Sequence, residues 1–306
     1  MTESTKSVLT PINLVYLLAP PLFWAGNAVI GRAMAAELAP MALSFWRWAL
    51  AFLIILPFTA KALWQAREEI RRRWGMILIC SMAGVGAYNS FQYLALQTST
   101  ALNVTLIASA SPVFILLFGA MFFKSPVSGR QWLGALLSII GVLWVVGRGD
   151  LDKVFAFHLS PGDIYILVAI AIWSIYTWLL RTRRPALAAA PFLAIQIGLG
   201  ALVILPFYLV EHALTGRTIT LTGPVIATFA YIGLLPSLAA YFCWDRAVAR
   251  TGAALPGYFV NLTPIFAALL AVVFLDETIA LYHLMGALFI FAGIALASLP
   301  AKARTS

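Results

Sequence analysis

Polar and aromatic side chains recur at helical spacing inside the long apolar stretches of this chain. Trp24, Asn27 and Gly31 follow one another at spacings i, i+3 and i+7, which places them on one face of a helix. Tyr88 and Gln92 are separated by four residues and so share a face as well. Aromatic rings and amides that face one space can contact the apolar part of a small molecule and hydrogen-bond to its polar part. The pattern predicts recognition of a small molecule.

We assign the residues of this kind to one central cavity, because several stretches direct an aromatic ring or an amide inward together. The candidate substrate-binding residues are Trp24, Asn27, Tyr88, Gln92, Ser109, Trp173, Tyr176, Trp244, Tyr258 and Asn261. Polar groups in membrane helices also serve as hydrogen-bonding contacts between helices, and this alternative is favoured for Asn89, Tyr93 and Thr105 taken singly.

Catalytic constellations are missing from the sequence. His158, His212 and His283 have no partner at metal-ligand spacing and are interpreted as interfacial polar residues. Nucleophile elbows, phosphate loops and dinucleotide-binding fingerprints are also missing. We therefore predict no catalytic residue, no metal site and no cofactor, and no enzyme.

Arg47 is the one basic residue well inside an apolar stretch. Its side chain could extend toward the membrane surface, pair with a carbonyl group, or meet a carboxylate-bearing substrate, and we expect the first. None of the 11 acidic residues lies in the middle of a stretch. A proton relay needs a titratable group in the path, so we expect exchange or downhill movement rather than obligatory proton antiport.

The composition places these residues in a lipid bilayer. Hydrophobic residues make up 62% of the chain, charged residues 10%, and the mean hydropathy is +0.95, whereas soluble domains are roughly 45–50% apolar and 25% charged. Stretches of about twenty apolar residues can each cross a bilayer as a helix. Ten are predicted, at 14–34, 40–62, 74–96, 101–123, 130–147, 163–181, 189–211, 224–246, 254–275 and 281–299. The fold class is therefore an all-α membrane protein.

The second half of the sequence repeats the first. Trp24 recurs 149 positions later as Trp173, and Ser111-Pro112 recurs 152 positions later as Thr263-Pro264. Each half holds five predicted spans, and an odd number of spans repeated in series crosses the membrane in the opposite sense the second time. Residues 1–150 and 151–306 are thus predicted to be two inverted five-helix repeats, an architecture of many secondary transporters.

The basic residues indicate the orientation. With both termini in the cytoplasm, most of the 20 Lys and Arg residues lie on the cytoplasmic side. The exceptions are Arg32, Arg148, Lys153 and Arg217, together with Arg47 inside a span. Both termini are predicted to be cytoplasmic, and the net charge of +9 reflects membrane topology, so no nucleic-acid partner is expected.

Prolines and glycines repeat between the halves. Pro112 and Pro264 occupy matching positions in spans four and nine, which indicates a pair of hinges, with a passive kink as the alternative. Glycines seven residues apart in spans five and ten, Gly134 with Gly141 and Gly286 with Gly293, leave smooth stripes for close helix packing. A homodimer through spans five and ten is one use of such stripes.

These features together resemble the EamA-type branch of the drug/metabolite transporter superfamily. The resemblance rests on the Trp24-x-x-Asn27 stripe, on Ser-Pro and Thr-Pro in spans four and nine, and on Phe274-Leu275-Asp276-Glu277 before Gly286 and Gly293. Within the branch the chain looks most like YddG-type aromatic amino-acid exporters. One departure is Lys124-Ser125, where many relatives have an acidic residue.

The resemblance implies a secondary transporter of the bacterial inner membrane that exports aromatic and other neutral amino acids by alternating access. Its path would run between spans 1, 3, 4 and 6, 8, 9. A multidrug exporter or a small-metabolite carrier of the nucleotide-sugar type is the alternative within the superfamily. A membrane scaffold that transports nothing is the alternative from another class.

Overall fold

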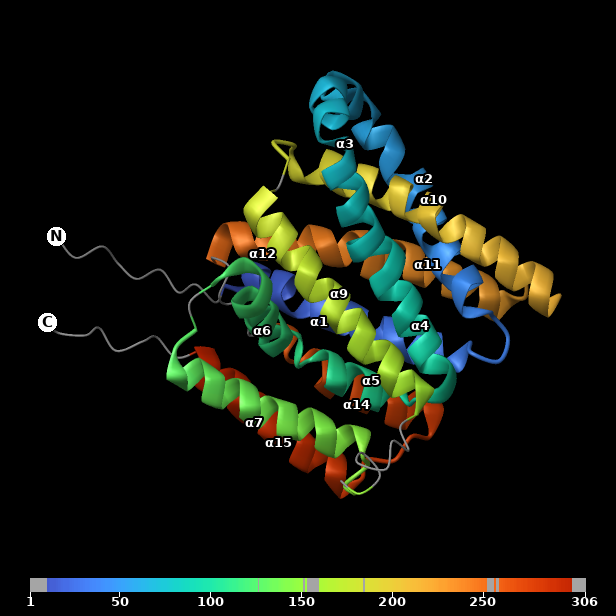
Figure 1. Ribbon diagram of the computed structural model, residues 1–306. Coiled ribbons are helices and arrows are strands. Elements are labelled where there is room, and N and C mark those ends of the chain that lie inside the picture. Colours follow the sequence, from blue (N-terminus) through green and yellow to red (C-terminus); the bar gives the residue numbers. More distant parts are fainter. Residues whose placement is uncertain are drawn as a thin grey trace, which may run out of the picture.

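The computed structural model describes residues 10–125, 127–150, 152, 160–183, 185–251, 256 and 259–298, and these residues form helices and connections without a β-strand. Figure 1 shows the helices as one bundle in which α1 begins and α15 ends at the same end. The helices are α1 (Pro11–Ala33), α2 (Pro40–Gln65), α3 (Arg67–Ser81), η1 (Met82–Ala87), α4 (Tyr88–Thr98), α5 (Ala101–Ala108), α6 (Ser111–Phe123), α7 (Gly129–Val146), α9 (Pro161–Arg183), α10 (Ala189–Thr215), α11 (Gly223–Leu234), η2 (Leu235–Ala239), α12 (Ala240–Thr251), α14 (Thr263–Leu275) and α15 (Leu281–Ser298).

Local sequence explains where several helices begin and end. Thr10 and Thr100 accept hydrogen bonds from backbone amides three residues on and so cap α1 and α5. Lys124 and Asp276 end α6 and α14 with positive φ angles of 50° and 52°. These two positions are 152 residues apart, so both repeats use the same left-handed helix end.

Six of the described helices are long and apolar enough to cross a membrane, and α5 with α6 make a seventh crossing if the bent pair is one span. Their outward faces are apolar, as at Leu53 in α2 and Leu202 in α10, where lipid can cover them. The helices α14 and α15 are shorter apolar segments that fall within the last two predicted stretches. The count of ten spans therefore stays a prediction.

Helix contacts follow the duplication seen in the sequence. The first helix of the first half, α1, packs against α12 and α14 of the second half. The first helix of the second half, α9, packs against α4 and α6 of the first half. The remaining major contacts join equivalent helices, α2 with α10 and α7 with α15. When the two halves are exchanged, each of these helix contacts therefore becomes another contact of the same set or stays the same.

Glycines bring α7 and α15 into close contact within one chain. A Cβ atom added at Gly141 would lie 2.8 Å from the carbonyl oxygen of Gly286, and one at Gly293 would lie 2.4 Å from that of Gly134. The glycine stripes are therefore used inside the bundle. A homodimer through spans five and ten would use the opposite faces of these helices, where Leu136 and Leu288 are exposed.

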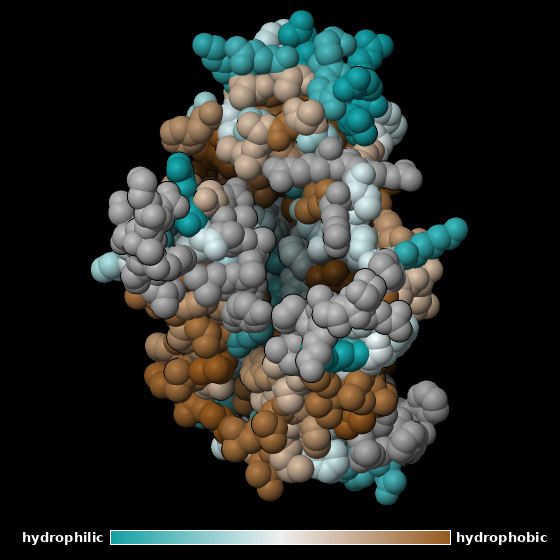
Figure 2. Space-filling model, turned by 90° about the vertical axis from the view of Figure 1, so that its left-hand side faces the viewer, coloured by the Kyte–Doolittle hydropathy of each residue, from teal (hydrophilic) through white to brown (hydrophobic). Residues whose placement is uncertain are grey.

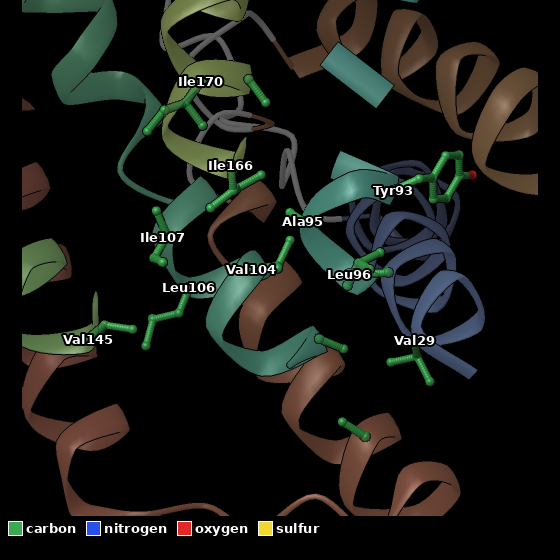
Figure 3. Close-up of a cluster of buried hydrophobic side chains, with 14 of the residues drawn as sticks. Val29, Tyr93, Ala95, Leu96, Val104, Leu106, Ile107, Val145, Ile166 and Ile170 are labelled. Carbon is green, nitrogen blue, oxygen red and sulfur yellow. The ribbon is translucent and has the colours of Figure 1, made fainter. Parts of the chain in front are cut away.

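The apolar core lies where the two halves meet. Figure 3 shows Val104 of α5 near Ala95 and Leu96 of α4, Ile107 near Ile166 of α9, and Leu106 directed toward Val145. The buried cluster also includes Val145 of α7 and Val29 of α1. Since lipid tails are as apolar as these side chains, their close packing and the buried hydrogen bonds hold the bundle together.

Candidate central binding site

The centre of the bundle is organised by Arg47. The helix α2 turns Arg47 inward next to Trp48 and Ala51, and only 2% of its surface is exposed. Its Nε atom donates to Ser237 Oγ at 2.7 Å, and Nη1 donates to Asn89 Oδ1 at 2.6 Å. The expectation that Arg47 extends toward the membrane surface is wrong, because these buried acceptors hold it inside.

Neutral oxygen atoms from both halves complete the surroundings of the guanidinium group. Nη1 also donates to Asn27 Oδ1 at 3.2 Å and to Tyr93 OH at 3.3 Å, and Nη2 donates to the carbonyl oxygen of Pro236 at 3.4 Å. The guanidinium carbon lies 4.6 Å from the ring centroid of Trp48. Cation–π attraction and hydrogen bonds thus compensate part of the cost of burying the charge.

Two predicted binding residues lie directly beside this arginine. The amide nitrogen of Asn27 donates to Gln92 Oε1 at 3.5 Å, and Tyr93 OH donates to Asn27 Oδ1 at 2.6 Å. All three side chains are buried. We call Asn27, Arg47, Asn89, Gln92, Tyr93 and Ser237 the polar centre.

An aromatic group from α1 and α12 lies next to the polar centre. The Trp24 ring packs edge-on against Tyr241, with centroids 6.1 Å apart, and lies 6.0 Å from Trp244. Trp24 Nε1 donates to the Pro236 carbonyl at 3.2 Å, the same oxygen that Arg47 contacts. Trp24, Tyr241 and Trp244 form the first aromatic group.

A second aromatic group joins α4 and α9. The Trp173 ring lies 5.0 Å from Tyr88 and 5.1 Å from Tyr176, and Gln196 of α10 donates to Tyr176 OH at 3.2 Å. Tyr88 directly precedes Asn89 in α4 and lies one helical turn before Gln92, so this second group adjoins the polar centre. Each of the two aromatic groups is built from both halves.

Single π-helical turns interrupt the helices at matching places in both repeats. A shift of 152 residues carries η1, Met82–Ala87, onto 234–239, which overlaps η2, Leu235–Ala239. Ser237 Oγ donates to the Ile232 carbonyl and accepts from Arg47. Such π-helical turns are frequent at functional sites because the widened ladder exposes backbone oxygens. Here η2 presents the Pro236 carbonyl to the polar centre.

Two candidate binding residues, Ser109 and Asn261, lie outside these groups. Ser109 donates to the Leu106 carbonyl of its own helix at 2.6 Å. Asn261 is half-buried in the turn directly before α14. Tyr258 lies outside the described residues.

Both hinge prolines lie in the first turn of a helix. Pro112 follows a break at Ser109 and Ala110, where α5 and α6 meet at a bend of 40°. Pro264 has the same position in α14. A proline there leaves no helical hydrogen bond unmade, because the first-turn amides lack partners anyway.

Sequence reasoning gave too little weight to five residues of the site. Asn89 and Tyr93 share a face at spacing i, i+4 but were interpreted as packing contacts, and Arg47 was assigned to the membrane surface. Ser237 and Pro236 were not predicted at all. A proline in the middle of an apolar stretch was the available signal for the exposed carbonyl.

Carboxylates close the bundle at the end opposite to the start of α1. Glu211 of α10 accepts from the Met41 and Ala42 amides at 3.1 and 3.0 Å, and Glu277 accepts from the Ala101 and Leu102 amides at the start of α5. Both carboxylates thus join the second half to helix N-termini of the first. Figure 2 views the other end, where a hollow with hydrophilic atoms inside opens in the middle of the face.

Apolar membrane helices around a buried polar and aromatic centre define a membrane protein with a candidate internal binding site. Comparison with protein-family models matches the EamA-like transporter family twice, at residues 12–147 and 160–299. The chain belongs to the EamA-like transporter family. It is a membrane transporter, and its class is that of a transporter rather than an enzyme.

Curated relatives carry transporter names. An uncharacterized transporter of Archaeoglobus fulgidus is 28% identical over 282 residues, covering 90% of this chain and 93% of the relative. The aromatic amino acid exporter YddG of Ancylobacter novellus is 25% identical over 206 residues, covering 67% and 69%. One solved crystal structure matches with a TM-score of 0.61 at 20% identity, over 99% of this chain and 100% of the other, and this likeness shows the fold alone.

Proposed function

We propose that this transporter exports aromatic and other neutral amino acids from the bacterial cytoplasm across the inner membrane. The observation that carries the proposal is the pair of aromatic groups next to one buried polar centre. An aromatic side chain can pack against Trp24 or Trp173, while the polar centre binds the groups on the Cα atom. The exporter name of the Ancylobacter relative supports the same substrate class.

The proposed path runs between spans 1, 3, 4 and 6, 8, 9 of a ten-span bundle with both termini in the cytoplasm. In this orientation the hollow of Figure 2 faces the cytoplasm, and the Glu211 and Glu277 contacts close the outer side. The halves 1–150 and 151–306 would close in turn around the central site. Spans four and nine would bend at Pro112 and Pro264 during this exchange.

The polar centre also bears on the alternatives. A carrier of cationic drugs would be expected to hold a carboxylate at its site. In the part of the chain that the structure describes, the buried charge at the centre is the arginine, and both ion pairs lie on α3, between Glu69 and Arg72 or Arg73. This arrangement favours an amino-acid exporter over an exporter of cations.

Flux through purified protein in liposomes tests the proposal. Liposomes preloaded with unlabelled phenylalanine should take up labelled phenylalanine by exchange, and tryptophan, threonine and methionine should be tested in the same way. We expect exchange without an imposed pH gradient. If none of the four amino acids moves, the substrate class is wrong, and if movement requires the gradient, the coupling is wrong.

A further inference from the structure

The charge of Arg47 has only neutral partners among the described residues. Its acceptors are two side-chain amides, two hydroxyl groups and one carbonyl group. An arginine keeps its positive charge in proteins. Among the described residues, the centre of the bundle therefore carries a net positive charge in a medium of low polarity.

Such a charge is costly unless an anion compensates it. Removing a charge from water costs several kcal/mol even after the protein relaxes, and neutral acceptors recover only part of that cost. A carboxylate pairs with guanidinium more strongly than a neutral oxygen does, because both groups are charged. The site is thus better suited to an anionic ligand than to its empty state.

Two donors at the centre make only long hydrogen bonds to one shared acceptor. Arg47 Nη2 carries two N–H groups and donates to the Pro236 carbonyl over a distance of 3.4 Å. Trp24 Nε1 reaches the same oxygen at 3.2 Å. A carboxylate placed beside this carbonyl would offer both donors a stronger acceptor.

We propose that Arg47 binds the carboxylate of the substrate, with Trp24 Nε1 as a second donor, so that a free carboxylate decides which molecules are carried. The inference rests on the proposed function and names the chemical group that the site selects. Asn27, Asn89 and Ser237 act as positioning residues, because their oxygens fix the plane of the guanidinium group. The substrates are small carboxylates with an apolar or aromatic side chain.

The first test uses the unchanged protein and four related molecules. Exchange of labelled phenylalanine is measured in liposomes while competitors are added outside. We expect 3-phenylpropionate, which keeps the carboxylate and lacks the amine, to compete. Phenethylamine and phenylalanine amide, which lack the carboxylate, should be weaker competitors than phenylalanine by at least about tenfold. Equal competition by the amine or the amide overturns the proposal.

The second test changes the arginine. Arg47→Lys keeps the charge but loses the planar pair of donors, so it should retain the preference for carboxylates at lower affinity. Arg47→Gln should bind phenylalanine no better than phenylalanine amide. Arg67→Gln, at an exposed arginine on α3, is the matched control and should behave as the unchanged protein. A strong carboxylate preference in a folded Arg47→Gln variant contradicts the proposal.

Binding to purified protein separates this inference from the proposed function and covers variants that fail to fold. Thermal unfolding of the unchanged protein in detergent is measured with 3-phenylpropionate and with phenethylamine. One outcome is that no amino acid moves in liposomes while 3-phenylpropionate, but not phenethylamine, raises the unfolding temperature. This outcome would support the anion site and contradict amino-acid export. If phenethylamine stabilises as much as 3-phenylpropionate, the anion site falls.

Discussion

The Nε atom of Arg47 lies 2.7 Å from Oγ of Ser237, which joins α2 of the first half to the π-helical turn η2 of the second. The same guanidinium group contacts Asn89 of α4 at 2.6 Å. One side chain therefore connects the two repeats at the polar centre. A movement that separates α2 from η2 would break this contact, so we expect the site and the proposed alternating-access change to be coupled at Arg47.

Removing either central tryptophan should reduce transport more than it reduces folded yield. Trp24→Ala and Trp173→Ala each remove an aromatic partner from the site, and aromatic contacts are worth about 0.5–1.5 kcal/mol each. We expect phenylalanine exchange to fall about tenfold, since each ring has two such partners. The readouts are exchange in liposomes and the monodisperse peak in gel filtration.

Trp74→Ala is the matched control, because Trp74 of α3 is 63% exposed. It should leave exchange unchanged. Normal exchange in both central variants would remove the two aromatic groups from the site.

Replacing the hinge prolines should slow transport while leaving binding largely intact. Pro112→Ala removes the ring that fixes φ at the start of α6 and adds an amide, so α5 can continue into α6 and the 40° bend should stiffen. Pro264→Ala should act on span nine, and the two variants should trap opposite faces because the halves are inverted. Exchange rate, ligand affinity and labelling of engineered cysteines on each face measure these effects.

Pro57, which lies inside the continuous helix α2, supplies the control variant Pro57→Ala. Its exchange rate should stay close to that of the unchanged protein. Unchanged exchange in both hinge variants would show that spans four and nine do not bend during transport.

Neutralising Glu277 should loosen the closure at the end of the bundle opposite to the start of α1. The carboxylate caps two amides at the start of α5, and a charge at a helix N-terminus is worth about 1 kcal/mol. In Glu277→Gln we expect faster amide hydrogen exchange in residues 101–108, measured by mass spectrometry, and unchanged exchange in α7.

The exposed Glu68 of α3 provides the comparison for this variant. Glu68→Gln should leave the exchange of 101–108 as it is. Protection of 101–108 that is equal in Glu277→Gln and in the unchanged protein would mean that the carboxylate does not hold the closure.

A methyl group at Gly141 should destabilise the contact between α7 and α15. The added Cβ atom would lie 2.8 Å from both the Gly286 carbonyl oxygen and the Ile290 amide nitrogen, and backbone atoms cannot move aside easily. We expect Gly141→Ala to cost about 1–3 kcal/mol and to lower the unfolding temperature in detergent. Gly129→Ala in the same helix meets no atom within 4 Å and should have little effect. Equal stability of the two variants would contradict this packing.

The sequence predicted the apolar helices and their duplication because both depend on residue type and spacing alone. Trp24 with Trp244, and Tyr88 with Trp173, were assigned to one site on helical periodicity, and the structure brings each pair together. These residues could be predicted because helical spacing shows which aromatic rings share a helix face with other aromatic or polar residues.

The position of Arg47 could not be predicted in this way. A lone arginine in an apolar stretch has acceptors at the membrane surface and acceptors in the bundle, and the spacing does not tell which are nearer. The deciding oxygens belong to Asn89 in α4 and to Ser237 in η2, residues 42 and 190 positions away. The contact between Gly141 and Gly286 within one chain could not be predicted for the same reason. A stripe of glycines indicates close helix packing but does not show which helix packs against it.

A structure of the protein with phenylalanine bound tests the central claim most directly. We predict the carboxylate within hydrogen-bond distance of Arg47 Nη2 and the phenyl ring against Trp24 and Trp244 or against Tyr88 and Trp173. Phenylalanine bound only at the surface, for example in the pocket lined by Arg32, Gln97 and Glu277 at the outer end, would contradict it.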